Sequence, residues 1–169
     1  EWTNQSFGTD YYSLTISVIG TNIIYTQARG RTHLGETKGY ITLLEKVVAS
    51  SIAQGEKYIL IEDYSYHTGA SNRAKNHFTN YHRQNDRLLG IIFCTRSVFF
   101  KITIKMGKRI ALPGFPVEIA DAYEPAIRLA LQWQQKQPTG RPDVAKRDAT
   151  PQSHIVVTKT GALPGKCPV

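Results

Sequence analysis

Residues 58–71 read "YILIEDYSYHTGAS" and combine an apolar run with a polar segment. Its apolar run, Tyr58–Ile61, predicts a short strand buried on both faces, as in a sheet that helices cover. The run ends at Glu62-Asp63, and the polar residues that follow predict a loop from Asp63 to Ser71. The stretch therefore indicates a strand that turns a polar corner.

A helix follows this corner. Serine is a favoured N-cap residue, and after Ser71 the apolar residues Ala74, Phe78 and Tyr81 recur at helical spacing up to about Asn85. A strand, a corner and a helix in succession form the repeating unit of a helix-covered sheet.

The remaining segments supply further units of the same kind. Alternating apolar residues predict strands, and apolar residues at three- and four-residue steps predict helices. The expected elements are strands at 11–19 and 23–28, a helix at 36–53, a strand at 88–94, a strand at 117–119 and a helix at 123–133.

Residues 98–110 fit two patterns. "FKITIKM" alternates as a strand does, whereas Phe99, Ile102, Met106 and Ile110 also fit helical spacing. The local pattern leaves both open. The chain order favours a helix, because parallel strands need a crossover between them.

Composition indicates one ordinary globular domain. The 169 residues are 41% hydrophobic and 20% charged, and no apolar run approaches the ~20 residues of a membrane span. We expect an N-terminal extension at 1–10, the domain at 11–135, and a basic Pro/Gly-rich linker or the start of a following segment at 136–169. The chain starts at Glu1 without a methionine, which suggests a fragment or processed product. Two cysteines form no ligand or disulfide pattern, which favours a reducing, cytoplasmic setting.

The element order resembles that of the STAS domain, the fold of bacterial anti-sigma-factor antagonists and of the cytoplasmic tails of sulfate transporters. The resemblance covers about residues 11–134, and the segments "YILIEDYS" and "GFPVEIADAYEPAIRLAL" carry it. It implies an α/β fold with a central mixed sheet, in the order strand, strand, helix, strand, helix, strand, helix, strand, helix, with the helices packed on the sheet.

Two longer segments carry a narrower resemblance. "LIEDYSYHTGAS" and "GKRIALPGFPVEIADAYEPAIRLAL" are similar to N-terminal modules of large bacterial sensor histidine kinases. This implies a non-catalytic sensory and regulatory module in a two-component signal-transduction protein, whose full-length parent is a protein histidine kinase. Its partner would be another protein or another domain of the same signalling chain, with a homodimer as an alternative.

The junction before the helix departs from the antagonist family. That family carries Asp-Ser-Ser-Gly with a phosphorylated serine, whereas this chain reads Thr68-Gly69-Ala70-Ser71. The hydroxyls of Thr68 and Ser71 are candidates for phosphorylation or for an anion site at the helix N-terminus. The alternative is that Ser71 only caps the helix, a contribution of ~1 kcal/mol.

The loop and the start of the helix are the expected interaction surface. Because Glu62 and Asp63 are adjacent in a strand, they point to opposite faces and form no catalytic carboxylate pair. Asp63 is expected to hold the loop by hydrogen bonds to the backbone. The interaction residues are Asp63, Ser65, His67, Thr68, Gly69, Ser71 and Asn72.

Catalysis and cofactor binding are not expected. His67, His77 and His82 lack metal-ligand spacing, and no nucleophile elbow or phosphate-binding loop is present. The sequence predicts no enzyme, no metal and no cofactor for this chain, and it specifies neither the partner nor the stimulus.

A basic stripe supports the alternative function, binding to a nucleic acid or another anionic surface. No acid lies between Arg87 and Glu118, and three lysines would share one helix face. A solvated helix face explains the same charges, and Phe99 and Phe100 are expected in the core rather than as stacking platforms, so nucleic acid is the less favoured partner. The stripe comprises Arg96, Lys101, Lys105, Lys108 and Arg109.

Overall fold

The computed structural model describes residues 5–111 and 116–136, with the side chains of 110 and 111 left out. Within these residues the chain forms six strands and four helices. They are β1 (Gln5–Thr9), β2 (Tyr12–Ile19), β3 (Ile23–Thr32), α1 (Leu34–Ser51), β4 (Tyr58–Ala70), α2 (Asn72–Gln84), β5 (Leu88–Cys94), α3 (Val98–Ala111), β6 (Val117–Ala120) and α4 (Tyr123–Lys136).

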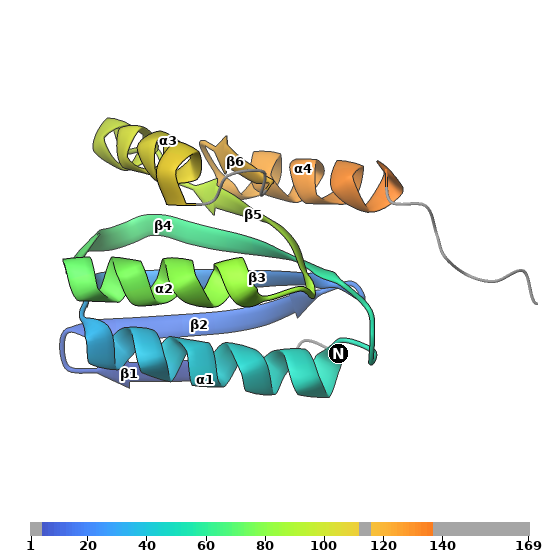
Figure 1. Cartoon of the computed structure of the whole chain (residues 1–169), viewed down its shortest axis with the longest axis horizontal. Helices are drawn as coiled ribbons and strands as arrows, with labels where there is room; N and C mark the ends of the chain where they lie inside the picture. The colour runs from blue at the N-terminus through green and yellow to red at the C-terminus, as the bar shows by residue number, and fades with distance from the viewer. Residues whose placement is uncertain (1–4, 112–115, 137–169) are drawn as a thin grey trace, which may run out of the picture. The chain divides into compact units, whose positions relative to one another are not determined.

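The strands form one mixed sheet in the order β1-β2-β3-β4-β5-β6 (Figure 1). The pairs β1–β2 and β2–β3 are antiparallel, whereas β3–β4, β4–β5 and β5–β6 are parallel. Each parallel pair is joined by one helix, α1, α2 or α3, because parallel neighbours need a crossover connection. The helix expected at 98–110 is therefore confirmed as α3.

The prediction of a polar loop between the strand and the helix is wrong. Residues 63–70 continue β4, which runs for 13 residues and pairs with β3 as far as Thr32 and Ala70. β3 is itself longer than expected, so the extension of β4 has a partner for its backbone groups. The charged pair that suggested a strand end is buried and hydrogen-bonded instead, with Glu62 and Asp63 at 3% and 5% exposure.

The segment expected as an N-terminal extension contains a strand. β1 pairs with β2 in the register Gln5↔Ile16 to Thr9↔Tyr12, and Phe7 packs against the core. The predicted 136–169 linker lies outside the described residues, apart from Lys136, which ends α4.

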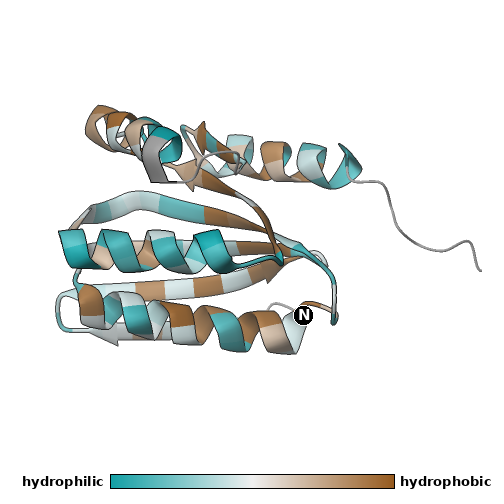
Figure 2. Cartoon of the chain, viewed as in Figure 1, coloured by the Kyte–Doolittle hydropathy of each residue, from teal (hydrophilic) through white to brown (hydrophobic). Residues whose placement is uncertain are grey.

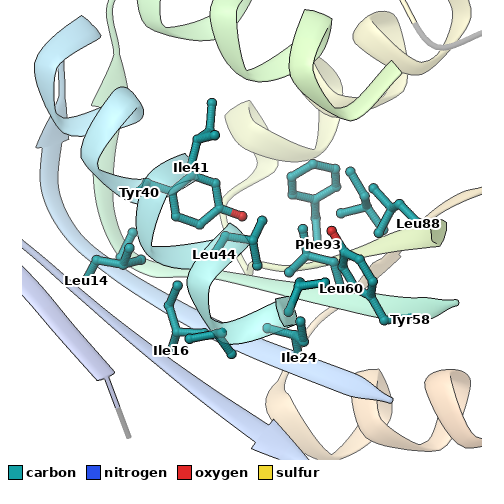
Figure 3. Packing of buried hydrophobic residues seen from close by; sticks show 14 of the residues in the cluster. Leu14, Ile16, Ile24, Tyr40, Ile41, Leu44, Tyr58, Leu60, Leu88 and Phe93 are labelled. Atoms are coloured by element: carbon teal, nitrogen blue, oxygen red, sulfur yellow. The ribbon is translucent and has the colours of Figure 1, made fainter. Parts of the chain in front are cut away.

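The sheet has a core on each face. On one face α1 contributes Tyr40, Leu44 and Val48, which pack on β2, β3 and β4, and Figure 3 shows Tyr40 and Leu44 above residues of these strands. On the other face α4 contributes Ala126 and Ala130. Burial of these apolar side chains is the main force that holds helices and sheet together.

The close approach of α4 to β5 depends on a glycine. A Cβ at Gly90 would lie 2.6 Å from Cζ3 of Trp133 and 2.8 Å from the carbonyl oxygen of Pro116. Gly90 therefore lets the helix and the loop before β6 approach the sheet closely. Within the described part of the chain, no helix combines the length and the apolar character needed to cross a membrane.

Candidate functional site

Glu62 and Asp63 lie on opposite faces of β4, as their adjacency predicts. Asp63 accepts hydrogen bonds from the Tyr25 hydroxyl at 2.5 Å, the Gln27 side-chain amide at 3.0 Å and the Ser65 backbone N–H at 2.9 Å. Burial raises the pKa of Asp63, but these hydrogen bonds outweigh it and hold the pKa below its ordinary value. The expected bond from Asp63 to the backbone is confirmed, although it stabilises a strand rather than a loop.

Glu62 occupies a different environment. Its carboxylate accepts a hydrogen bond from the Tyr40 hydroxyl, and among the described residues no ion pair to it is seen. Burial raises the pKa of Glu62 to about 7, and the hydrogen bonds from Tyr40 and Thr26 lower it only in part. A carboxyl group without a cationic partner is costly to bury in its charged form.

An irregularity in β4 brings His67 to the face that carries Glu62. Between the pairs Gln27↔Asp63 and Arg29↔Tyr66, β4 has one residue more than β3. Such a bulge reverses the alternation of side chains along the strand. His67 therefore lines the same cavity as Glu62 and Tyr64.

His67 is neutral in this position. Its Nε2 lies 2.8 Å from the Thr32 hydroxyl, whereas its Nδ1 is buried without a hydrogen-bond partner. Burial lowers the pKa of His67 to about 4. The ring packs against Tyr64 and Phe100, with centroids 4.7 and 5.7 Å apart.

These groups surround a cavity of about 210 Å³ between the sheet and the helices α1, α2 and α3. Tyr12, Tyr40 and Tyr64 lie near Glu62, and burial together with the charge of Glu62 raises the pKa of each of these tyrosines. Aromatic residues line much of the remaining surface, including Phe78, Phe93 and Phe100. A concave, mainly apolar pocket with a few convergent polar groups is the usual form of a small-molecule site.

Sequence reasoning missed this cavity. Its residues come from eight elements, β2 to β6 and α1 to α3, so no local motif marks it. The available signal was the aromatic-rich run Tyr64-Ser65-Tyr66-His67. Aromatic residues are enriched in strands, so this run favours a strand over the predicted loop.

The predicted interaction residues divide into exposed and buried groups. Ser65, Thr68 and Asn72 are exposed, whereas Asp63 and His67 are buried and support the segment from within. Gly69 has a φ of 133°, a backbone conformation that residues with a side chain rarely adopt. The segment is thus the end of a strand with three exposed polar side chains on or beside it.

Ser71 is the N-cap of α2. Its hydroxyl oxygen accepts a hydrogen bond from the Ala74 backbone N–H at 3.3 Å, and its own N–H donates to the carbonyl of Thr32 at 3.0 Å. The capping role is confirmed, and phosphorylation of Thr68 or Ser71 stays a prediction.

The three histidines do not meet. His77 is half-buried on α2, and His82 is fully buried among Tyr40, Phe78 and Tyr81 with both ring nitrogens unpartnered. Burial lowers the pKa of His82 to about 3. Among the described residues no group of His, Cys, Asp or Glu side chains could hold a metal ion.

The basic stripe is partly neutralised by acids from outside its segment. Lys101 forms an ion pair with Asp121 at 2.5 Å, and Lys108 bonds to the Val117 carbonyl at 2.6 Å and approaches Glu118 at 3.7 Å. Arg96 donates to the backbone carbonyl of Asp121 at 3.4 Å. Lys105 and Arg109 remain exposed on α3. The sequence placed no acid within the stripe, but β6 and the turn after it supply two.

The prediction that Phe99 lies in the core is wrong. Phe99 is 71% exposed, whereas its neighbour Phe100 is half-buried and lines the cavity. Large apolar residues recur along α3, in contrast to the mostly hydrophilic α2 (Figure 2). We call the exposed set the α3 apolar face: Val98 at 69% exposure, Phe99 at 71%, Ile102 at 54% and Met106 at 59%.

Comparisons of sequence identify no relative: no protein-family model matches the chain, and no curated protein matches it. Comparisons of structure do. An uncharacterized DUF3478-family protein with a SpoIIAA-like fold from Shewanella loihica PV-4 superposes with a TM-score of 0.57 at 9% identity, over 73% of this chain and 98% of that one. The anti-sigma factor antagonist SpoIIAA in its unphosphorylated form superposes with a TM-score of 0.50 at 7% identity, over 70% and 97% of the two chains. The chain therefore has the α/β SpoIIAA-like (STAS) fold, which confirms the expected fold class.

Proposed function

We propose that this domain is a non-catalytic regulatory module that binds another protein, or another domain of its own signalling chain, through the α3 apolar face. The observation that carries the proposal is the exposure of Val98, Phe99, Ile102 and Met106 on one helix. Contiguous exposed apolar residues with charged residues beside them are typical of protein-binding surfaces.

Charge indicates the chemistry of the partner. Lys105 and Arg109 flank the apolar residues and are exposed, whereas Arg128 on α4 forms an ion pair with Glu124 at 4.0 Å. A partner with an apolar patch bordered by carboxylates would match α3, because opposite charges at the rim favour encounter and register. The domain itself carries too few free bases on α3 for a nucleic-acid site to be the better explanation, since Lys101 and Lys108 pair with Asp121 and Glu118.

The end of β4 contacts α3 through side chains that face the cavity. Phe100 of α3 packs against Tyr64 and His67, and Ser65 and Thr68 lie exposed on the same strand. The parent protein that we propose is a bacterial sensor histidine kinase, in which α4 would pass the signal to the following segment.

Photo-crosslinking tests the proposal. The chain is expressed in its native cell with p-benzoylphenylalanine in place of Ile102, and adducts are identified by mass spectrometry. We expect one discrete protein adduct that Phe99→Asp weakens. The matched control carries the same photo-reactive residue in place of Tyr11, which is 64% exposed on the N-terminal side of β2. Equal adducts at both positions, or none at position 102, would contradict the proposal.

A further inference from the structure

The cavity beneath α3 contains a buried carboxyl group without a cation. Glu62 lines it, is 3% exposed and accepts a hydrogen bond from Tyr40, and the structure shows no ion pair to it among the described residues. Figure 3 shows the Tyr40 hydroxyl directed from α1 towards the sheet. Of the two lysines that line the cavity, Lys108 is engaged with Val117 and Glu118, and Lys75 is exposed.

Aromatic rings surround this carboxyl group. Tyr64 packs against both Phe93 and Phe100, with centroids 5.4 and 5.8 Å apart, and Tyr40 stacks on Phe78 at 5.9 Å. All of these rings line the cavity. The faces of aromatic rings attract cations, and a set of rings around one acid is the arrangement that recognises organic ammonium groups.

The size of the cavity limits the ligand. Its volume of about 210 Å³ exceeds the ~150 Å³ apolar cavity that admits benzene, and it is smaller than the ~300 Å³ at which drug-sized sites begin. One ring with a short polar arm fits this volume. The α3 side chains that the structure describes, at residues 98–109, are all exposed or half-buried.

We propose that this cavity binds a small aromatic amine, with the ammonium or N–H group donating to the Glu62 carboxylate and the ring lying among Tyr64, Phe93 and Phe100. The amine supplies the positive charge that Glu62 lacks. This inference goes beyond the proposed protein-binding role and does not depend on it, because the ligand site lies beneath α3 and the protein-binding face lies on its outer side.

The test uses three one-ring probes of similar size that differ in charge: benzylamine, benzyl alcohol and benzoate. Each is titrated into the isotope-labelled chain at pH 8, and binding is followed by amide and methyl chemical shifts. At this pH Glu62 is mostly ionised, because burial raises its pKa only to about 7. We expect benzylamine to bind about tenfold more tightly than benzoate, since a buried carboxylate attracts a cation and repels an anion. The largest shifts should occur at Phe93 and Phe100.

Three variants separate the site from general effects. Glu62→Gln keeps the shape of the side chain and should reduce the preference for benzylamine over benzoate to about twofold or less. Phe100→Ala removes part of the wall and should weaken all three probes. Phe99→Ala, on the outer side of the same helix, is the matched control and should leave all three affinities unchanged.

Each outcome decides the proposal. Saturable binding of benzylamine that Glu62→Gln weakens selectively supports it. No saturable shift at the cavity, tighter binding of benzoate, or an unchanged preference in Glu62→Gln overturns it, provided that the dispersed spectrum shows the variant to be folded. The two proposals can fail separately: the absence of a crosslinked partner at position 102 would not change the probe affinities measured for the cavity.

Discussion

Replacing Glu62 with glutamine should stabilise the protein at alkaline pH. The buried carboxylate lies beside Tyr12, Tyr40 and Tyr64, and no basic side chain is seen to pair with it in the described part of the chain. Glutamine has the same shape, and its amide oxygen can accept the hydrogen bond that Tyr40 donates. The substitution therefore removes a buried charge and keeps its main contact.

The pKa of Glu62 sets the magnitude. Burial raises this pKa from 4.5 to about 7. Each unit of pKa difference between the folded and unfolded states corresponds to ~1.36 kcal/mol. Because the folded state holds the proton more tightly than the unfolded state, the contribution of Glu62 to stability is fully present below about pH 4.5 and is lost as the pH rises through about 7. At pH 8 the loss is about 3 kcal/mol, which Glu62→Gln should recover in large part. At pH 5 the gain should be below ~1 kcal/mol.

Urea denaturation at pH 5 and pH 8 measures this difference in the free energy of unfolding. The matched control is Asp63→Asn, one residue along the strand. Hydrogen bonds from Tyr25, Gln27 and Ser65 stabilise the ionised carboxylate of Asp63. Its replacement by asparagine should therefore lower the free energy of unfolding at pH 8 by ~1–3 kcal/mol. If Glu62→Gln destabilised the protein equally at both pH values, the reasoning about its buried charge would be refuted.

Three further predictions concern stability. Ser71→Ala should lower the free energy of unfolding by ~1 kcal/mol in urea titrations, because it removes the bond that caps α2, and an unchanged midpoint would contradict this. Gly30→Ala should destabilise by more than ~2 kcal/mol, since φ is 83° and a Cβ would lie 2.1 Å from the Tyr11 carbonyl oxygen, whereas Gly20→Ala, at φ 62° with open space, should cost only ~1 kcal/mol. The pKa of His82 lies at about 3, below the ordinary 6.5, so its contribution is lost as the pH falls from 6.5 towards 3, and His82→Leu should flatten the acid limb of the stability profile.

Much of the fold could be predicted because its elements carry strong local patterns. Tyr40, Leu44 and Val48 recur at helical spacing and do cover one face of the sheet, and Glu62 and Asp63 do lie on opposite faces. β1 escaped prediction because its five residues, Gln5–Thr9, contain one large apolar side chain, Phe7.

The errors arose where tertiary contacts override local composition. Residues 63–70 are polar and contain Gly69, yet β3 offers them a pairing partner. Phe99 and Phe100 are adjacent and chemically identical, so only the packing of α3 decides which of them faces the sheet. The cavity depends on this packing and on the bulge that turns His67 inward, and neither is encoded in a short motif.

We propose that α3 presents a protein-binding face. The direct measurement is an isothermal titration of the protein captured by the crosslinker at position 102, with the wild-type chain, Phe99→Asp and, as a control on an exposed side chain elsewhere, Tyr11→Asp. We expect saturable binding by the wild type and by Tyr11→Asp, and at least about a tenfold loss of affinity in Phe99→Asp, because truncation of a central apolar anchor costs more than ~1 kcal/mol. Equal affinities of all three chains for that protein would show that α3 is not the binding face.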